Sequence, residues 1–290
     1  DEFCLAQPVR IRKREKMKAD CFMRAPLICV QKRSISQAEI AHTPYVGRFL
    51  ENRLGNPQLK IAFAKQWCQH HPGPVLDLGN PSGQLALALV KEGVHTSTLE
   101  SDPFSITNLR SARETLGHLS KDLFQIYPFD FSKFEIDQKF QTIFCSPQVM
   151  EEPETELSIL GGLRQVLAHL NSEGSFFAEV HNLDFFELHR PFRDESWRYL
   201  EDCSWLEGRS RVWERTYAGT KESQTVFEYA VSNELNDFLL YRTTLHLFNQ
   251  DQWMKLFEVA GFLVEDCFGD WKGTEPNSQH PCLIFHLKAR

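Results

Sequence analysis

The residues best suited to bind a ligand form the segment Asp77-Leu78-Gly79-Asn80-Pro81-Ser82-Gly83, where a predicted strand passes into a predicted helix. Gly79 permits a tight turn, and Gly83 lets a ligand and the helix approach closely. Glu100 lies at the end of the next predicted strand, where a carboxylate can accept hydrogen bonds from both ribose hydroxyls of a nucleoside. The spacing therefore predicts a nucleoside site at the carboxyl ends of two parallel strands.

Two classes of nucleoside ligand fit this pattern, a dinucleotide and S-adenosylmethionine. A pyrophosphate needs several free backbone N–H groups at the start of the helix, and Pro81 in the middle of the turn has none. Asn80 and Ser82 contribute polar side chains instead, and Asp77 can reach toward the ammonium group of an amino-acid tail. The turn favours S-adenosylmethionine, while an NAD-type oxidoreductase remains a disfavoured alternative.

Four residues further along the chain are candidates for contact with a second substrate. His181 ends a predicted strand and is our candidate general base, with His246 as the second. Tyr241 and Arg242 could line a substrate pocket. For each of them the alternative is structural: a histidine hydrogen-bonded in a turn or on a sheet, and half-exposed sheet residues.

Strand and helix patterns alternate between residues 74 and 182, which predicts a parallel, doubly wound sheet with right-handed crossovers. Residues 34–73 read as helices, and residues 183–248 read as an antiparallel insertion. A helix over 249–261 and two further strands end the chain. The predicted segments between 74 and 182 are strands at 74–79, 95–100, 123–131, 140–146 and 175–182, and helices at 82–93, 102–117 and 154–174.

Composition limits the classes of protein to which the chain can belong. It has 290 residues and a net charge of -7, and no apolar run reaches the about 18 residues that a membrane helix needs. Eight scattered cysteines are typical of reduced thiols in a cytoplasmic protein. Residues 1–33 hold nine Lys or Arg and four Asp or Glu, a basic arm that could touch nucleic acid or simply be solvated. The acidic remainder argues against nucleic acid as the main substrate. The lack of a long apolar run argues against an integral membrane protein.

Motifs in order from residue 74 to the end resemble those of class I S-adenosylmethionine-dependent methyltransferases, most of all the glycine/sarcosine N-methyltransferase-like kind. "VLDLGNPSGQLALAL" resembles the family's D-x-G-x-G-x-G motif, "LESDP" the second motif, and "YPFDF" the segment that contacts adenine. "FQTIFCS" resembles the fourth strand, and "FNQDQWMKLFEVAGFLVEDCFGDWKG" the last helix and strand. The chain departs from the family at Pro81, where the family has a glycine.

The resemblance implies an α/β fold: a Rossmann-like, seven-stranded mixed sheet with helices on both faces. It implies a methyltransferase domain at 74–290, with 183–248 inserted over the cleft; the charge pattern and the helical spacing place a basic arm at 1–33 and a helical cover at 34–73 before it. It also implies transfer of a methyl group from S-adenosyl-L-methionine, leaving S-adenosyl-L-homocysteine, to an oxygen or nitrogen of a small-molecule acceptor. A catalytically silent subunit that serves as a binding module, and a homodimer, remain open.

The resemblance also assigns roles to residues around the cofactor. Tyr45 and Arg48 would lie over its methionine part, with Arg48 on the carboxylate. Asp130 would contact the adenine amino group with Phe131 beside the ring, and the fourth strand would end near the transferred methyl. The predicted cofactor-binding residues are Tyr45, Arg48, Asp77, Gly79, Asn80, Ser82, Gly83, Glu100, Ser101, Asp130, Phe131 and Cys145; no metal is expected.

Overall fold

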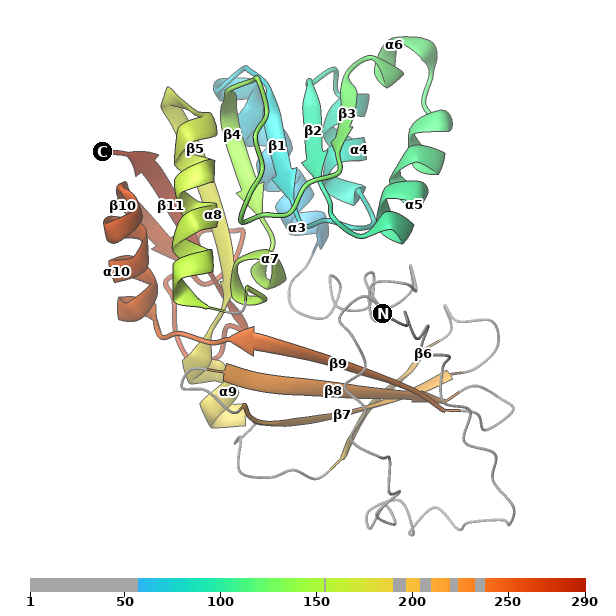
Figure 1. The fold of residues 1–290 in the computed structure, drawn as a ribbon, viewed down its shortest axis with the longest axis vertical. Helices are drawn as coiled ribbons and strands as arrows, with labels where there is room; N and C mark the ends of the chain where they lie inside the picture. Colours follow the sequence, from blue (N-terminus) through green and yellow to red (C-terminus); the bar gives the residue numbers. More distant parts are fainter. Residues whose placement is uncertain (1–56, 154, 190–196, 204–209, 220–223, 233–237) are drawn as a thin grey trace, which may run out of the picture. The chain divides into compact units, whose positions relative to one another are not determined.

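The computed structural model in Figure 1 describes residues 57–153, 155–189, 197–203, 210–219, 224–232 and 238–290. The predicted basic arm, residues 34–56 of the predicted helical cover, and with them Tyr45 and Arg48, lie outside these residues. The described residues divide into two compact units. Residues 57–189 and 245–290 belong to the first, and those between 197 and 244 belong to the second.

The first unit is built on one seven-stranded mixed sheet, as the sequence predicts, with strand order β10-β11-β5-β4-β1-β2-β3. Strand β11 is antiparallel to both of its neighbours, and the other neighbouring strands are parallel. The strands are β1 (Val75–Leu78), β2 (Thr96–Leu99), β3 (Phe124–Tyr127), β4 (Phe140–Cys145), β5 (Leu170–His181), β10 (Phe262–Phe268) and β11 (Cys282–Ala289).

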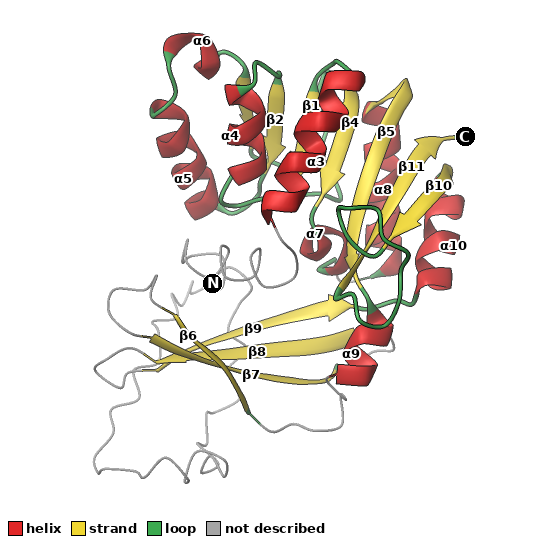
Figure 2. Cartoon of the chain, turned by 180° about the vertical axis from the view of Figure 1, so that it is seen from behind, coloured by secondary structure: helices red, strands yellow, loops and turns green. Residues whose placement is uncertain are grey.

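Helices cover both faces of this sheet (Figures 1 and 2). One face carries α3 (Pro57–His70), α4 (Gln84–Lys91) and α5 (Pro103–Glu114), and the other carries α8 (Glu156–His169) and α10 (Gln250–Ala260). The short helices α6, α7 and α9 connect strands. They span His118–Lys121, Pro147–Glu151 and Leu183–His189. None of the helices in the described part of the chain is long and apolar enough to cross a membrane.

Local capping explains where two of these helices begin. The Asp102 side chain accepts a hydrogen bond from the Ser105 N–H, and Pro103 occupies the first turn of α5. Asn249 and Gln252 form a reciprocal capping box at the start of α10. Gly261 ends α10 with a φ of 104°, a left-handed conformation that favours glycine. Both predicted helix starts are confirmed.

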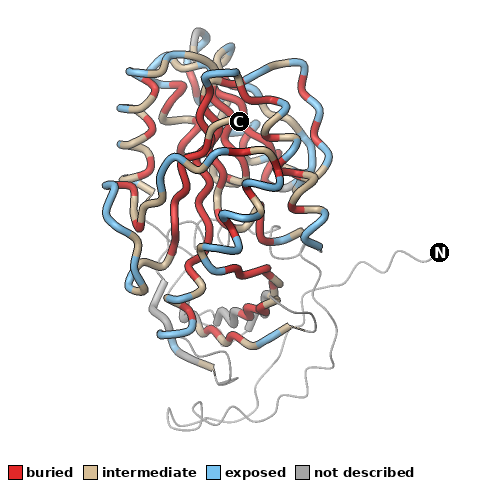
Figure 3. Tube along the Cα trace, turned by 90° about the vertical axis from the view of Figure 1, so that its left-hand side faces the viewer, coloured by how far each residue is buried: buried red, intermediate tan, exposed pale blue. Residues whose placement is uncertain are grey.

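The inner strands of this sheet are buried along most of their length, as the burial-coloured tube in Figure 3 shows, whereas the edge strands β3 and β10 are largely accessible. Alternate residues of β1 face opposite layers: Leu76 and Leu78 pack with residues of α8 and α10, while Val75 packs with residues of α3 and α4. A sheet that is covered on both faces exposes its polar ligand-binding groups only where its strands end. The strand ends therefore define where a site can form.

The predicted boundaries differ most from the structure at two places. The helix predicted over 154–174 ends at His169, because the chain from Leu170 pairs with β4 and sheet pairing overrides the local helical pattern. The strand predicted over 123–131 ends at Tyr127, directly before Pro128, whose missing N–H cannot extend the ladder.

The second unit contains an antiparallel sheet with strand order β6-β7-β8-β9. Its strands are β6 (Arg198–Cys203), β7 (Ser210–Ala218), β8 (Gln224–Ser232) and β9 (Phe238–His246), although the last residues of β9 belong to the first unit. In the β7–β8 register Arg215 lies opposite Glu228. The antiparallel strands predicted for residues 183–248 are confirmed where the structure describes them, but the sequence gives strand-like runs only from residue 205 on, so β6 is missed.

Candidate functional site

The turn between β1 and α4 is tight and internally hydrogen-bonded. Gly79 and Gly83 have φ values of 72° and 65°, which other residues rarely adopt. The Gly83 N–H donates to the Asn80 carbonyl at 2.9 Å, and the Ser82 hydroxyl donates to Asn80 Oδ1 at 3.0 Å. With the Gly83 donor used and Pro81 lacking one, the turn is poorly equipped to hold a phosphate.

Helix α7 packs directly on this turn. A Cβ added to Gly79 would lie only 1.6 Å from Cγ2 of Val149, so no larger residue fits at position 79 while α7 stays in place. Val149 itself is only partly buried. The glycine is thus required both by its backbone conformation and by the close approach of α7.

Glu100 is fixed where β2 ends. Its Oε1 accepts hydrogen bonds from the backbone N–H groups of Ser101 at 2.9 Å and of Asp102 at 3.0 Å. The side chain remains partly accessible. A carboxylate oxygen can accept more than one hydrogen bond, so ribose hydroxyls can be added to a carboxylate that is already oriented.

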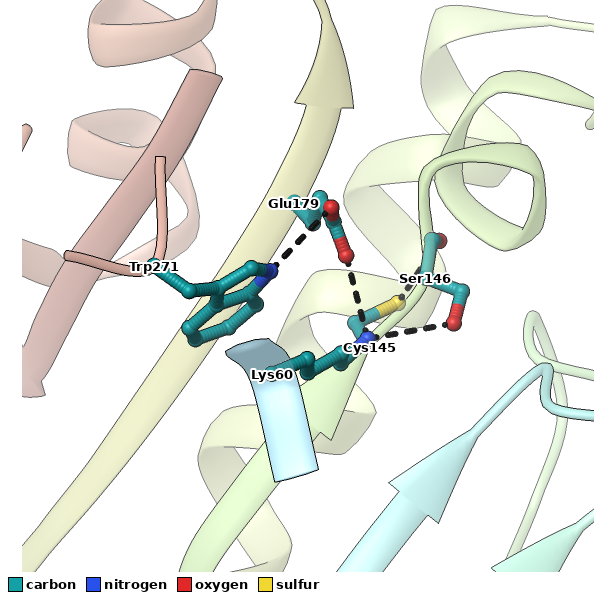
Figure 4. A network of polar contacts seen from close by, with 5 residues as sticks. All are labelled: Lys60, Cys145, Ser146, Glu179 and Trp271. Atoms are coloured by element: carbon teal, nitrogen blue, oxygen red, sulfur yellow. Dashed lines mark hydrogen bonds and ion pairs between the residues drawn. The ribbon is translucent and has the colours of Figure 1, made fainter. Parts of the chain in front are cut away.

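A buried charged cluster lies beside the ends of β4 and β5 (Figure 4). The Lys60 ammonium, which α3 contributes, donates to Glu179 Oε2 at 3.1 Å and to the Ser146 hydroxyl at 3.3 Å. Trp271 donates its indole N–H to the other Glu179 oxygen at 3.3 Å, and its ring lies 5.4 Å from the Lys60 nitrogen. Both charged side chains are less than a tenth exposed.

Asp77 belongs to the same electrostatic group. Its side chain is completely buried on β1. Burial lowers the pKa of Lys60, but the charges of Glu179 and Asp77 outweigh it and hold that pKa above its usual value. Two carboxylates thus act on one ammonium and together keep it charged.

A second buried pair joins β5 to α7. Nδ1 of His181 contacts Oε2 of Glu151, and the His181 backbone N–H donates to Glu151 Oε1 at 2.6 Å. Both side chains are almost completely buried, and burial raises the pKa of Glu151 despite the opposing effect of His181. A carboxylate at Nδ1 favours the tautomer in which Nε2 is the proton acceptor. The two contacts with Glu151 therefore fix the ring of His181 in the buried end of β5.

The comparisons with known proteins match this geometry at the level of the fold. No protein-family model and no curated protein matches the sequence. The chain is similar to the CcbJ methyltransferase from Streptomyces caelestis, with a TM-score of 0.71, 18% identity, and 81% of this chain and 90% of the other covered. This chain has the class I methyltransferase fold.

Two further structures with the methyltransferase fold agree. An S-adenosylmethionine-dependent methyltransferase from Clostridium acetobutylicum has a TM-score of 0.69 at 12% identity, with 87% of this chain and 98% of the other covered. CalS10, an amino pentose methyltransferase from Micromonospora echinaspora, was solved with S-adenosylmethionine bound. It has a TM-score of 0.60 at 15% identity, with 79% of this chain and 90% of the other covered.

The methyltransferase fold brings several predicted residues to one edge of the sheet. Four of them lie at or near the carboxyl ends of neighbouring parallel strands: Asp77 on β1, Glu100 after β2, Cys145 on β4 and His181 on β5. Cys145 is completely buried, and burial raises the pKa of its thiol far above the usual range. It therefore acts as a small core residue rather than a nucleophile.

Two further predicted cofactor residues, Asp130 and Phe131, lie beyond the end of β3. Asp130 is exposed, and its Oδ1 accepts a hydrogen bond from the Ser132 N–H. Phe131 is buried in the core, where a Cβ on Gly162 of α8 would lie 2.1 Å from its ring. The ring of Phe131 therefore packs on a helix, which does not favour the predicted position beside adenine.

The predicted substrate residues on β9 divide between the two units. His246 is buried with its ring stacked 6.0 Å from that of Phe248, in the first unit. Arg242 pairs with Glu228 in the second unit. Tyr241 lies on β9, but its side chain is outside the described residues.

The sequence analysis missed Lys60, Glu151, Glu179, Trp271 and Val149. One of them carries a readable signal: Glu179 is the single acid in the otherwise apolar strand segment "SFFAEV", and an acid there must be paired when the strand is buried. Lys60 and Glu151 lie on amphipathic and mixed segments where a charged residue is ordinary. Only the three-dimensional packing reveals their partners.

Proposed function

We propose that the protein binds S-adenosylmethionine where β1, β2 and β4 end and transfers its methyl group to an oxygen or nitrogen of a small acceptor. The observation that carries the proposal is the Glu100 carboxylate. It is held at the end of β2 by two backbone N–H groups, beside a turn that disfavours phosphate. The methyltransferase fold supports the same ligand, because CalS10, which shares it, was solved with S-adenosylmethionine.

The buried charges suit the amino-acid part and the sulfonium of this ligand. Asp77 and Glu179 are buried carboxylates near the ends of β1 and β5, and a carboxylate favours binding of a positively charged group nearby. S-adenosylmethionine supplies an already activated methyl group. The protein's contribution is therefore to align donor and acceptor and to exclude water, which can lower a barrier by roughly 7–11 kcal/mol in favourable cases.

His181 would remove the proton that a hydroxyl or protonated amine must lose. Glu151 contacts its Nδ1, and the tautomer with the proton on Nδ1 is the one in which Nε2 can accept a proton. In this arrangement His181 acts as the base and Glu151 as the positioning residue.

A second function, a silent subunit of the same fold, is favoured by one contact. Val149 lies against Gly79, on the turn that a nucleoside would approach. If α7 holds this position permanently, the turn is closed to the ligand and the fold would serve only as a binding module.

Calorimetric titration with S-adenosylmethionine and S-adenosylhomocysteine tests the proposal. We expect saturable binding that Glu100→Ala weakens at least tenfold, because two ribose hydrogen bonds to a charged group are lost. Glu114→Ala is the matched control, since it removes an exposed carboxylate that pairs with Lys121 on the protein surface. Absence of binding to the folded wild-type protein would contradict the enzyme and support the silent subunit.

A further inference from the structure

The antiparallel sheet of the second unit carries a charged group that the proposed methyl transfer does not use. Glu228 on β8 has a completely buried side chain, and two arginines contact it from the neighbouring strands: Arg215 on β7 and Arg242 on β9. The Tyr217 hydroxyl also donates to Glu228 Oε1, at 3.0 Å. One carboxylate is thus shared by two guanidinium groups and a phenol.

The charge of this group does not cancel. Burial opposes ionisation of Glu228, but its hydrogen bonds to Arg215 and Arg242 outweigh that effect and hold the pKa of Glu228 below its usual value. An ionised Glu228 neutralises one arginine, so the group retains one net positive charge. A cation held in partly desolvated surroundings favours a counter-ion more than a fully solvated one does.

The two arginines are also accessible. Their side chains are 31% and 29% exposed, whereas the carboxylate between them is fully covered. Among the described residues, both guanidinium groups donate to Glu228 and to no other side chain. A guanidinium has several N–H donors in a fixed fork, so donors remain on each arginine for an incoming oxyanion.

Aromatic rings hold the first arginine in place. The Arg215 guanidinium lies 4.9 Å from the ring centre of Trp197 and 5.6 Å from that of Tyr217. Stacking on ring faces leaves the edge of a guanidinium, where its N–H groups lie, directed away from the rings. Glu228 and the rings therefore pre-orient the two arginines at little further entropic cost on binding.

From this arrangement we propose that Arg215 and Arg242 form a binding site for the oxyanion of a small molecule, a carboxylate or a phosphate. The buried Glu228 orients both arginines without neutralising both. Binding here uses no group of the seven-stranded sheet, so it does not depend on the proposed methyl transfer.

Side-chain NMR of the full chain tests the proposal. Titration with inorganic phosphate and, separately, with acetate should shift the arginine Nε–H signals of Arg215 and Arg242 saturably, and glycerol should not. The tighter of the two anions identifies the class of oxyanion. If neither anion produces a saturable shift at these two arginines, the proposal is wrong.

A variant of one site arginine and a matched control sharpen the test. Arg242→Gln should weaken binding about tenfold, because a charge-assisted hydrogen-bond donor is lost. Arg110→Gln removes the same charge from an exposed position on α5 and should leave the affinity unchanged. If Arg242→Gln and Arg110→Gln weakened binding equally, the effect would be one of overall charge, and the proposed site would be wrong.

Glu228→Gln should change the anion affinity in the opposite direction, and this test does not require the arginine variants to fold. It removes the competing negative charge while keeping a hydrogen-bonding side chain, so anion affinity should rise several-fold. Unchanged or weaker binding in a folded Glu228→Gln protein would contradict the proposal.

Discussion

At the scale of single residues, the pair formed by His181 and Glu151 gives the clearest link between geometry and chemistry. The carboxylate contacts Nδ1 and also accepts the backbone N–H of the same histidine. Two contacts from one carboxylate fix both the position and the orientation of the ring. If His181 is the base, as we propose, a ring fixed in this way needs little reorganisation when it accepts a proton.

Glu151→Gln should therefore separate orientation from folding. The amide can still accept the His181 N–H, but its NH₂ would donate to Nδ1 and reverse the tautomer, leaving Nε2 protonated. We expect kcat for methyl transfer to fall by about 10²–10⁴-fold, the usual contribution of a general base, with S-adenosylmethionine affinity unchanged. Turnover across pH and calorimetric affinity measure the two effects.

The outcome that would contradict this role is a normal kcat and pH profile in the Glu151→Gln protein. His181→Ala provides the comparison, since it should lose at least as much activity. If Glu151→Gln instead loses cofactor affinity and keeps kcat, Glu151 supports the site only structurally.

The buried Lys60–Glu179 pair carries a prediction about stability. Lys60→Met should lower the free energy of unfolding by about 3–5 kcal/mol, because Glu179 would be left as a buried carboxylate without its ammonium. The double variant Lys60→Met/Glu179→Gln should be less destabilised than Lys60→Met alone. Denaturant unfolding of the four members of this cycle measures the coupling, and simple additivity would contradict it.

At the scale of elements, α7 determines how open the β1–α4 turn is. Gly79→Ala should lower the free energy of unfolding by about 1–3 kcal/mol, because a Cβ at a φ of 72° is strained and would overlap Val149. Adding Val149→Ala should recover the steric part of this loss and leave the backbone part. A double variant no more stable than Gly79→Ala would show that α7 does not pack on the turn in solution.

The sequence predicts elements well where a local signal marks them. The helices predicted over 102–117 and 249–261 begin within one residue of the predicted positions, because the caps at Asp102 and Asn249 are each satisfied within their own turn. The helix end at His169 was missed, because pairing with β4 decides it. Within the site, Glu100 follows from its strand, whereas Val149 over Gly79 depends on a contact between segments about 70 residues apart.

At the scale of the whole molecule, the two units should respond differently to acid. The pKa of Glu228 is lowered in the folded state, so it contributes stability above its ordinary value of 4.5 that is lost as the pH falls through the folded value. At pH 7, Glu228→Gln should lower the free energy of unfolding of the second unit by about 1.5–3 kcal/mol, and this difference should shrink as the pH falls through the lowered pKa of Glu228. Hydrogen exchange of β7 and β8 amides measures it, with β4 and β5 as the internal reference. A difference independent of pH would contradict the ionised pair.

The cysteines have a practical consequence for following how the first unit opens. The four whose side chains the structure describes are free thiols, three of them buried, on α3, β4, β10 and β11. Burial raises the pKa of Cys68 to about 11 and that of Cys267 to about 12. Because only thiolates react quickly with alkylating reagents, each cysteine becomes labelled when its own segment detaches. Mass spectrometry of pulse-labelled peptides would then give the order in which α3, β4, β10 and β11 detach from the sheet.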